Sequence, residues 1–329
     1  MAEERLDFEK SIVEIEKKIE ELKKFTESKE IDFSEEIRKL ESKAEKMKKE
    51  VYDSLTPWQR TQVARHLQRP RTLDYIKRIF EQYIPLHGDR SYKDDPAVVG
   101  GLAVIENIPV FVIGLQKGKD TKDNILRNFG MAHPEGYRKA LRLMLMAEKF
   151  DKPVISFVDT PAAYPGIGAE ERGQAEAIAK NLREMSGLKV PIIVVVHGEG
   201  GSGGALAIAV GDRILMLENA IYSVIPPEGC AAILWKDSSK ASEAATVLKL
   251  TAQDLYELRV IDEIIKEPAG GTHRNYDKTA KEVKDAVLRN LKECMALNRQ
   301  ELLDRRYKKF RNMGSFLEVT EEAAKEEPS

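Results

Sequence analysis

The sequence is poor in cysteine, in long apolar runs and in net charge. Its 329 residues include only two cysteines, Cys230 and Cys294. Two thiols exclude a four-cysteine zinc site and a disulfide framework, and such sparse use fits a reducing compartment. The apolar runs, such as residues 190–196, are far shorter than the ~20 residues that span a bilayer. We therefore expect no membrane segment.

Neither sign of charge dominates the chain. Lys and Arg number 53 and Asp and Glu number 55, which gives a net charge of -2. Such a balance argues against nucleic acid or an anionic membrane as the main partner. The N-terminus is acidic and has no apolar core of a signal peptide, so we expect a cytoplasmic protein.

The first 50 residues are dense in charge, with 13 positive and 16 negative side chains. Apolar residues recur beneath them at steps of three and four, which places each set on one face of a helix. Residues 1–52 are therefore predicted to form an antiparallel, coiled-coil-like helical hairpin that packs on the body or a partner, or else extends as a solvated arm. The apolar positions are Ile12, Ile15, Ile19 and Leu22, then Ile37, Leu40, Ala44, Met47 and Val51.

The rest of the chain divides into a connector rich in Pro and Arg (53–96), a body (97–312) and an acidic tail (313–329). Strand-like and helix-like patterns alternate through the body, which predicts an α/β fold. A β-hairpin is expected around Glu106 and Asn107, and a helix over residues 170–186. The irregular rhythm, with short helices, favours a spiral of ββα units over a doubly wound sheet.

The most specific local feature is a glycine-rich loop, HGEGGSGGAL, at 197–206. Five of its seven residues from 198 to 204 are glycine, between a buried strand and a short helix predicted over 203–210. Glycine lets a ligand reach the main chain, and free amides at a helix start favour an anion such as a phosphate or an oxyanion. The alternative is a tight turn that needs small residues for packing.

Three interpretations of this loop remain open on the residues alone. Gly198, Gly200 and Gly203, with Glu218 further on, match the spacing of a dinucleotide-binding fingerprint, although the following helix is too short. Ser202 lies in a G-x-S-x-G pattern, and Asp262 and His273 follow it in the order found in α/β-hydrolases. The third interpretation needs no nucleophile, because the backbone amides of Gly203 and Gly204 would hold an oxyanion.

Six blocks of sequence resemble the family of carboxyltransferase α subunits of bacterial-type acetyl-CoA carboxylase, over roughly residues 5–312. They are WQRTQVARHLQRPRTLDYI (58–76), HGDRSYKDDPAVVGGLA (87–103), QKGKDTKDNILRNFGMAHPEGYRKALRLM (116–144), FVDTPAAYPGIGAEERGQAEAIAKNL (157–182), GEGGSGGALAIAVGDRILML (198–217) and YSVIPPEGCAAILWKD (222–237).

The resemblance implies a crotonase-type ββα superhelix for residues 97–312. It also implies a β subunit that bears a zinc ribbon, an α2β2 assembly, and no metal on this chain. The reaction implied moves a carboxyl group from carboxybiotin, held on a separate biotin carboxyl carrier protein, to acetyl-CoA, which gives malonyl-CoA for fatty acid synthesis. Biotin carboxylase completes the enzyme system.

The family places one oxyanion hole on each subunit, and the hole for carboxybiotin falls on the amides of Gly203 and Gly204 here. A side chain at Gly204 is therefore expected to impair transfer more than folding. Weaker candidates for the carboxybiotin pocket are Gly201, Ser202, Tyr164 and Pro165. Contacts to CoA or to the carrier are assigned, also weakly, to Lys117, Lys119, Lys122 and Arg127, which otherwise form a solvated basic loop.

Two functions of other classes stay open beside this one. The chain could be a scaffold that contributes no chemical group, or a stand-alone serine hydrolase that uses Ser202 as its nucleophile.

Overall fold

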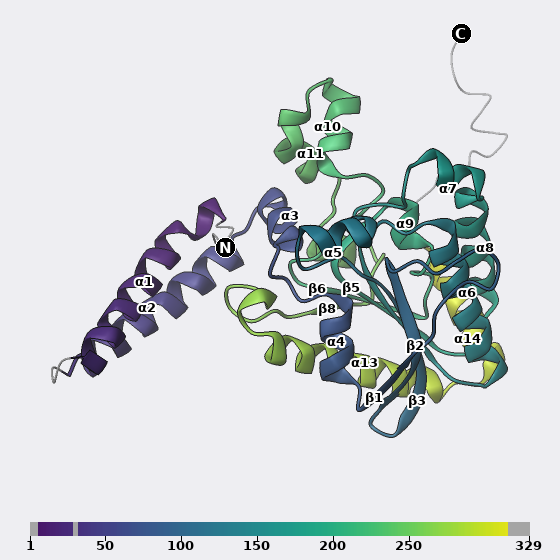
Figure 1. Cartoon of the computed structure of the whole chain (residues 1–329), viewed down its shortest axis with the longest axis horizontal. Coiled ribbons are helices and arrows are strands. Elements are labelled where there is room, and N and C mark those ends of the chain that lie inside the picture. The colour runs from purple at the N-terminus through teal and green to yellow at the C-terminus, as the bar shows by residue number, and fades with distance from the viewer. Residues whose placement is uncertain (1–5, 29–31, 315–329) are drawn as a thin grey trace, which may run out of the picture.

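A computed structural model of the chain describes residues 6–28 and 32–314. Figure 1 shows a long two-helix arm that points away from a larger body, and a smaller helical arm that rises from the body. The expected acidic tail lies outside the described residues, apart from Met313 and Gly314.

The long arm is the predicted helical hairpin. Helices α1 (Lys10–Ser28) and α2 (Ser34–Asp53) lie side by side, and Ile19, Ile37 and Ala44 form a thin buried seam between them. The spacing of apolar residues at steps of three and four thus produced the expected face. Most other side chains of the two helices lie in water.

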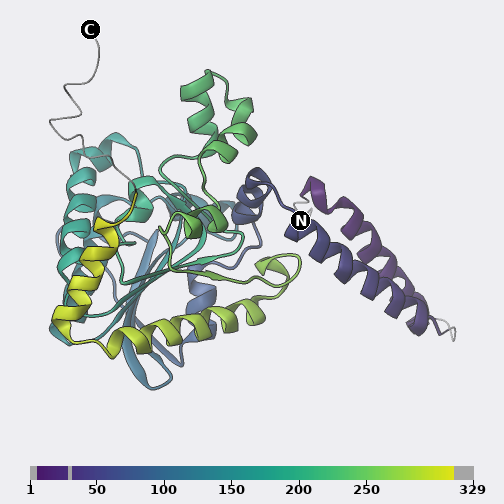
Figure 2. The ribbon, with the colours of Figure 1, turned by 180° about the vertical axis from the view of Figure 1, so that it is seen from behind.

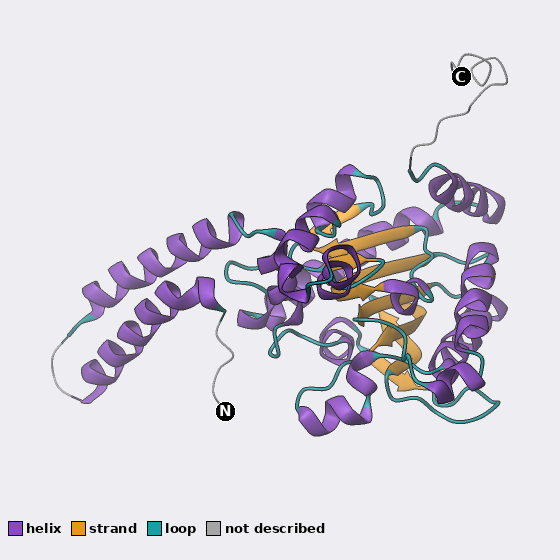
Figure 3. Cartoon of the chain, turned by 90° about the horizontal axis from the view of Figure 1, so that it is seen from above, coloured by secondary structure: helices purple, strands orange, loops and turns teal. Residues whose placement is uncertain are grey.

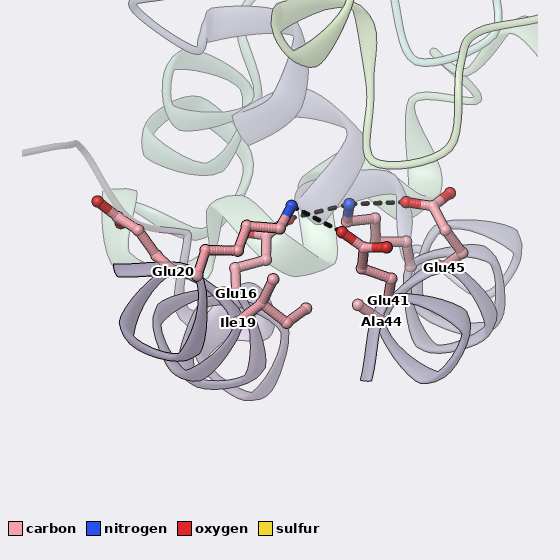
Figure 4. A pocket seen from close by; sticks show the side chains of 8 residues that line it. Glu16, Ile19, Glu20, Glu41, Ala44 and Glu45 are labelled. Carbon is pink, nitrogen blue, oxygen red and sulfur yellow. Dashed lines mark hydrogen bonds and ion pairs between the residues drawn. The ribbon is translucent and has the colours of Figure 1, made fainter. Parts of the chain in front are cut away.

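A shallow groove of about 580 Å³ runs along this hairpin. Charged side chains line the groove around two apolar ones, Ile19 of α1 and Ala44 of α2. Figure 4 labels these two together with Glu16 and Glu20 of α1 and Glu41 and Glu45 of α2. Lys23 bridges the helices to Glu41 at 2.7 Å, with both side chains about half exposed. Pairs this exposed contribute little to stability.

The hairpin is fixed to the body only near its base. Arg274 of the body donates to Glu16 at 2.8 Å and to Glu9 at 3.1 Å, and the Tyr52 hydroxyl donates to Glu9 at 2.8 Å. Both expected alternatives therefore hold in part, because the base packs on the body while the rest extends as a solvated arm.

The connector at 53–96 supplies elements of the body. Thr56 and Gln59 form a capping box that starts α3 (Pro57–Arg65), and α4 (Thr72–Ile79) follows. Strand β1 (Gln82–Pro85) then pairs with β2 at the edge of the main sheet. Since Tyr75, Ile76 and Ile79 of α4 belong to the main apolar core, this segment and the body share one core.

One sheet organises the body, in the order β1-β2-β3-β4-β5-β6-β8, with β7 also paired to β5. The first three strands are antiparallel and the later pairs are parallel, which confirms an α/β fold. The expected β-hairpin is present, and Glu106 and Asn107 both have positive φ, as in a type I′ turn. The strand bounds are β2 (Val98–Ile105), β3 (Ile108–Leu115), β4 (Val154–Thr160), β5 (Ile192–Gly201), β6 (Arg213–Leu217), β7 (Ile221–Ser223) and β8 (Glu263–Ile265).

Helices cover both faces of this sheet, as Figure 3 shows from above. A Cβ at Gly100 would meet Leu143 of α6, whereas one at Gly114 would meet Thr72 of α4. Gly100 pairs with Ile113, the neighbour of Gly114, and adjacent residues of a strand face opposite sides. Helix α6 (Pro134–Lys149), packed on α8 (Gln174–Gly187), therefore lies on one face, and α4, packed on α13 (Tyr276–Met295), on the other.

The C-terminal helices close the body on the side seen in Figure 2. Arg306 of α14 (Arg299–Arg311) is buried and donates to both carboxylate oxygens of Asp212, at 2.7 and 2.8 Å, and to the carbonyls of residues 185, 188 and 190. The remaining helices are α5 (Thr121–Leu126), α7 (Ile167–Glu171), α9 (Ser202–Leu206), α10 (Pro227–Trp235), α11 (Ala241–Val247) and α12 (Ala252–Glu257).

Two expected elements differ from the structure. The helix predicted over 170–186 is split into α7 and α8, because Gly173 takes a left-handed conformation at φ 81° between them. The helix predicted over 203–210 is the much shorter α9, and most of the expected glycine loop before it is a continuation of β5.

Candidate functional site

The site is built on residues 198–204, the end of β5 together with the first residues of α9, and this segment is here called the glycine strand. Its residues pair with β7 on one side, where Glu199 lies opposite Ile221, and with the end of β4 on the other, where Gly200 lies opposite Thr160. Strand β5 then turns directly into α9. Gly198, Gly200 and Gly201 are therefore held in a sheet where a loop was predicted, whereas Gly203 and Gly204 lie at the start of α9.

Close packing requires four of the five glycines. A Cβ at Gly198 would lie 2.3 Å from Asp159 Oδ1, and one at Gly201 would lie 1.9 Å from the Pro161 carbonyl oxygen. One at Gly200 would meet the Tyr222 ring at 2.7 Å, and one at Gly204 would lie 2.4 Å from backbone atoms of residues 162 and 163. The packing interpretation of the glycines therefore holds for these positions.

Gly203 is different from the other four. A Cβ there would meet only Ile178, at an ordinary 3.7 Å, and its φ lies outside the left-handed region. Packing therefore gives no reason for glycine at this position. Like Gly204, it lies in the first turn of α9, where backbone amides have no acceptor within the helix. With only five residues, α9 adds little dipole, so any anion site here would depend on the amides themselves.

The expected side-chain test at Gly204 needs correction for the same reason. Its Cβ would collide with the backbone of the 160–165 loop rather than enter free space. A valine there would displace that loop, so a loss of activity would not separate an effect on chemistry from one on folding. Gly203 is the position at which a side chain can be added cleanly.

An apolar groove of about 340 Å³ lies beside Gly203. Ser202, Leu206 and Val260 line it, together with Tyr222 and Val224. It is open to solvent next to half-buried Gly203, so a flat and largely apolar group would fit against the backbone there.

The structure does not support the other two interpretations of the motif. The residues of the hydrolase pattern do not come together as a catalytic triad. Ser202 has a positive φ of 52°, as an exposed nucleophile at a strand-to-helix turn would. However, Asp262 is occupied by Lys309 and by the Ile214 amide, while His273 stacks on His66 with ring centroids 4.1 Å apart. These contacts place the acid and the base in separate environments.

The backbone of these glycines does not have the structure that a dinucleotide-binding fingerprint requires. Gly198 and Gly200 are strand residues, and the helix that would follow the motif has five residues. The expected acidic partner, Glu218, accepts from Lys266 at 2.6 Å and from the Glu267 amide at 3.2 Å.

Tyr164 and Pro165 lie in the loop that packs against the glycine strand. The Tyr164 ring stacks on His133 with centroids 4.2 Å apart, and its amide donates to the Ala132 carbonyl. Pro165 is exposed. This loop is held close to Gly204 through residues 162 and 163, so both side chains stay candidates for the pocket.

The four basic candidates have separate surroundings. Lys117 is buried, with 8 % exposure, so the solvated-loop interpretation was wrong for this residue. Lys119 pairs with Asp74 at 2.6 Å, and Arg127 donates to the Pro96 carbonyl at 2.7 Å. Lys122 is exposed on α5. Lys119 and Lys122 stay candidates for contact with CoA or the carrier.

A buried charge network supports the glycine strand from beneath. Lys117 Nζ lies 2.6 Å from Glu199 Oε2 and 2.8 Å from Asp159 Oδ1, and the Glu199 amide donates to the same Asp159 oxygen at 3.0 Å. Arg71 reaches the other oxygen of Asp159 at 3.3 Å. Arg65 donates to Glu199 Oε1 at 2.6 Å. Every carboxylate oxygen of Asp159 and Glu199 therefore has a cation beside it.

The network sets the protonation of its members. Burial alone would raise the pKa of Asp159, but Lys117 and Arg71 outweigh it and hold that pKa well below its usual range. Burial lowers the pKa of His197, next to the glycine strand, to about 3. Its Nε2 lies 3.1 Å from the Thr72 hydroxyl, and its carbonyl accepts from Arg69 at 2.7 Å. His197 is thus a neutral packed residue.

Sequence reasoning missed Arg65 and Arg71. The available signal was the density of arginine at 60–71, four in twelve residues, in a segment that otherwise resembles a connector. Nothing in the spacing shows that three of these arginines reach Asp159, Glu199 and the His197 carbonyl across the sheet.

Two further findings concern the described part of the chain. None of the helices in residues 6–28 and 32–314 is both long enough and apolar enough to cross a membrane. Within the same residues, no group of three or more His, Cys, Asp or Glu side chains is placed to hold a metal ion. The absence of metal stays a prediction.

Comparison with known families gives one consistent result. The model of a family described as acetyl co-enzyme A carboxylase carboxyltransferase-like matches residues 5–314. A protein of Geobacter metallireducens named acetyl-coenzyme A carboxylase carboxyl transferase subunit alpha is 59% identical over 314 residues, covering 95% of this chain and 98% of that protein. A protein of the same name from Geobacillus kaustophilus is 59% identical over 317 residues, covering 96% of this chain and 98% of its own.

Solved structures share the fold at low identity. A Pseudomonas malonate decarboxylase hetero-tetramer in complex with coenzyme A aligns with a TM-score of 0.58 at 15% identity, over 71% of this chain and 91% of that one. Transcarboxylase 12S aligns with a TM-score of 0.51 at 22% identity, over 65% of this chain and 41% of that one. The body therefore has the crotonase-like fold of carboxyltransferases, and the expectation of a ββα spiral is confirmed.

Proposed function

The chain belongs to the family of carboxyltransferase α subunits of acetyl-CoA carboxylase, and we propose from that premise how its glycine strand serves the reaction. The chain is a subunit of an enzyme that transfers a carboxyl group. In the proposal, a β subunit that bears a zinc ribbon completes the active site in an α2β2 assembly. The carboxyl group comes from carboxybiotin on a separate carrier protein, which biotin carboxylase recharges, and acetyl-CoA becomes malonyl-CoA. A cytoplasmic location stays a prediction.

The observation that carries the proposal is the contrast between Gly203 and its neighbours. Four glycines are needed for packing, whereas a Cβ at Gly203 would make only ordinary contact with Ile178, and its first-turn amide faces no intrahelical acceptor. A residue without a side chain is useful here only if something else must approach the backbone. We assign that role to carboxybiotin.

The residues present fit such a group. The groove beside Gly203 is lined by apolar side chains, which suit the carbon skeleton of biotin, and backbone amides at its edge suit an oxyanion. When bound, carboxybiotin supplies the carboxyl group and a ureido oxygen on which negative charge develops. The amides of Gly203 and Gly204 would donate to that oxygen, and the buried network beneath the strand would hold them in place.

The test is the reverse reaction, malonyl-CoA-dependent carboxylation of biocytin, with the chain in complex with a β subunit. Gly203→Val is expected to lower kcat about 100-fold, in the range for an oxyanion hole that is lost, while thermal stability and binding to the β subunit stay unchanged. Gly187→Val is the matched control, because a Cβ at Gly187 in α8 meets nothing within 4 Å. Wild-type rates in Gly203→Val would contradict the assignment of the site.

The same assay separates the alternatives. A scaffold that contributes no chemical group would tolerate Gly203→Val. A serine hydrolase would lose its activity on ester substrates with Ser202→Ala, whereas carboxyl transfer through backbone amides should survive that change. Activity that requires the β subunit, persists in Ser202→Ala and is lost in Gly203→Val would support the proposal against both.

A further inference from the structure

We propose that Arg65 is a positioning residue that couples the smaller arm, α10 and α11, to the glycine strand. The inference rests on the function proposed above for that strand. Arg65 touches neither the groove nor Gly203. It acts through Glu199, which it holds on one side, and through Glu228 of α10, which it holds on the other.

Glu199 is the side chain by which the glycine strand is held. Of the seven residues from 198 to 204, only Glu199 and Ser202 have side chains beyond hydrogen, and Ser202 lines the open groove. A run of glycine has high conformational freedom and cannot lock itself by side-chain packing. Beside its backbone pairing with β4 and β7, the position of this strand therefore depends on what binds the Glu199 carboxylate.

One oxygen of that carboxylate is bound inside the body. Lys117 contacts Glu199 Oε2 and Asp159 Oδ1, and the Glu199 amide returns to the same Asp159 oxygen, so the three residues form a closed ring of contacts. Burial would raise the pKa of Glu199, but Lys117 and Arg65 outweigh it and lower that pKa, which keeps the group a carboxylate. Both of its oxygens can then accept from cations.

The other oxygen is bound by Arg65, which also reaches the arm. From the last turn of α3, Arg65 Nε lies 2.6 Å from Glu199 Oε1, while its two terminal nitrogens lie 2.5 and 3.3 Å from the carboxylate oxygens of Glu228. A guanidinium can serve two carboxylates at once because its donors are fixed in one plane, which a lysine ammonium cannot reproduce. Glu228 lies in the first turn of α10.

The arm is built as a separate unit. Cys230, Ala231 and Ala244 form a small core of its own, and α11 packs on α3, the helix that carries Arg65. Figure 1 shows α10 and α11 standing clear of the sheet. Ile233 and Leu234 of α10 are 70 % and 61 % exposed, so the arm has an apolar surface.

Besides the apolar cluster that Ala245 of α11 shares with Ala64 of α3 and Ile221 of β7, two connections link the arm to the glycine strand. One is the main chain, because β7 pairs with residues 199–201 and leads into α10. The other is the side-chain bridge from Glu228 through Arg65 to Glu199. The bridge can be cut by substitution without removing a strand, which makes its contribution measurable.

The experiment compares Glu228→Gln with Glu243→Gln in the complex with a β subunit. Both changes remove one carboxylate from the arm, but Glu243 is exposed on α11 and lies outside the bridge. Two quantities are measured: kcat and KM for malonyl-CoA-dependent carboxylation of biocytin, and hydrogen exchange of the amides at 198–204. Glu228→Gln is expected to lower kcat about 10-fold, to leave the KM for malonyl-CoA unchanged and to speed exchange at the glycine strand. Glu243→Gln should match wild type.

Further variants decide the remaining outcomes. Arg65→Lys keeps the positive charge but cannot donate to two carboxylates at once, so its effects on kcat and on exchange should resemble those of Glu228→Gln. The double variant should show little further change in either quantity. Unchanged exchange in Glu228→Gln, or additive effects in the double variant, would overturn the coupling even if activity falls. If the wild-type complex is inactive, the proposed function fails, whereas the exchange of 198–204 still tests the bridge. A KM effect alone would also overturn the proposal.

Discussion

Ion pairs are frequent in two regions, the hairpin of α1 and α2 and the buried charge network beneath the glycine strand. Water surrounds the pairs of the hairpin, whereas protein surrounds those of the network. In the hairpin, pairs such as Lys24 with Glu20 have side chains that are about two-thirds exposed. Beneath the glycine strand, Asp159 is fully buried and Glu199 nearly so. The same residue types therefore serve solubility in one region and exact placement of a backbone in the other.

The two regions differ in how much stability is lost when one member of an ion pair is removed. An exposed Glu that loses its Lys is hydrated by water, so little stability is lost. A buried carboxylate that loses its cation stays desolvated and uncompensated. The comparison predicts that matched substitutions will have very different effects in the two regions.

The largest effect is expected for Lys117→Met. This change leaves Asp159 and Glu199 buried without the cation that they share, and should lower the free energy of unfolding by about 3 to 5 kcal/mol. Urea denaturation of the chain measures it. Lys39→Met, which removes an exposed pair with Glu35, is the control in the hairpin. Similar losses in both variants would break the comparison.

The next largest effect on stability is expected where a new methyl group would meet a neighbouring backbone. Gly204→Ala should cost about 2 kcal/mol, because the new methyl group meets the backbone of residues 162 and 163. Gly203→Ala should be neutral or slightly stabilising, since alanine favours a helix over glycine and space is available. Thermal denaturation of the two variants side by side tests whether the two glycines differ as described.

A pH effect of similar size should be confined to the body. His197 has a pKa lowered to about 3, so the unfolded chain binds its proton more readily between that value and the usual 6.5. Stability contributed by neutral His197 is present above pH 6.5 and falls as the pH drops, by about 2 kcal/mol at pH 5. The hairpin at 6–53 contains no histidine.

Hydrogen exchange at pH 7 and pH 5 resolves the two regions, after correction for intrinsic rates. Protection should fall in β5 more than in α1 and α2. A His197→Asn variant should lose only part of the pH dependence, because burial also lowers the pKa of His273 to about 2 and that group keeps its contribution. An equal loss of protection in the hairpin would show that the two regions do not respond separately.

The smallest effect is expected within the hairpin itself. Lys23→Gln removes the bridge to Glu41 and should change stability by less than about 0.5 kcal/mol, because both groups are half exposed. Ile19→Ala, which opens the buried seam, should cost several times more. Circular dichroism during thermal melting compares the two. A larger effect for Lys23 would mean that the ion pairs, rather than the seam, hold the helices together.

Several parts of this protein could be predicted because they depend on local pattern. The steps of three and four from Ile12 to Val51 gave both helices of the hairpin, and Glu106-Asn107 gave the β-turn. The helix over 170–186 was predicted without its break, because the left-handed Gly173 is one glycine among 21. The resemblance of six sequence blocks to a known family, rather than periodicity, led to the crotonase-like fold.

The candidate site was predicted only in outline. Sequence pattern singled out residues 198–204, but it could not tell the glycines apart. Gly204 and Gly201 are close to the 160–163 backbone, and Gly203 is not, which depends on how two strands and a loop pack. Lys117 was predicted to lie in a solvated loop because it belongs to a basic segment. Lys119 and Lys122 of that segment are exposed, but Lys117 is buried.

The sequence alone therefore determined which elements form and to which family they belong, because helix faces, turns and motif spacing are local properties of the chain. The tertiary structure decided the role of each charged residue. Arg65, Lys117 and Glu199 are separated by 52 and 82 positions in the chain, yet they meet in one buried network. Their strength arises from removal of water, and only the packed fold determines which charges lose it.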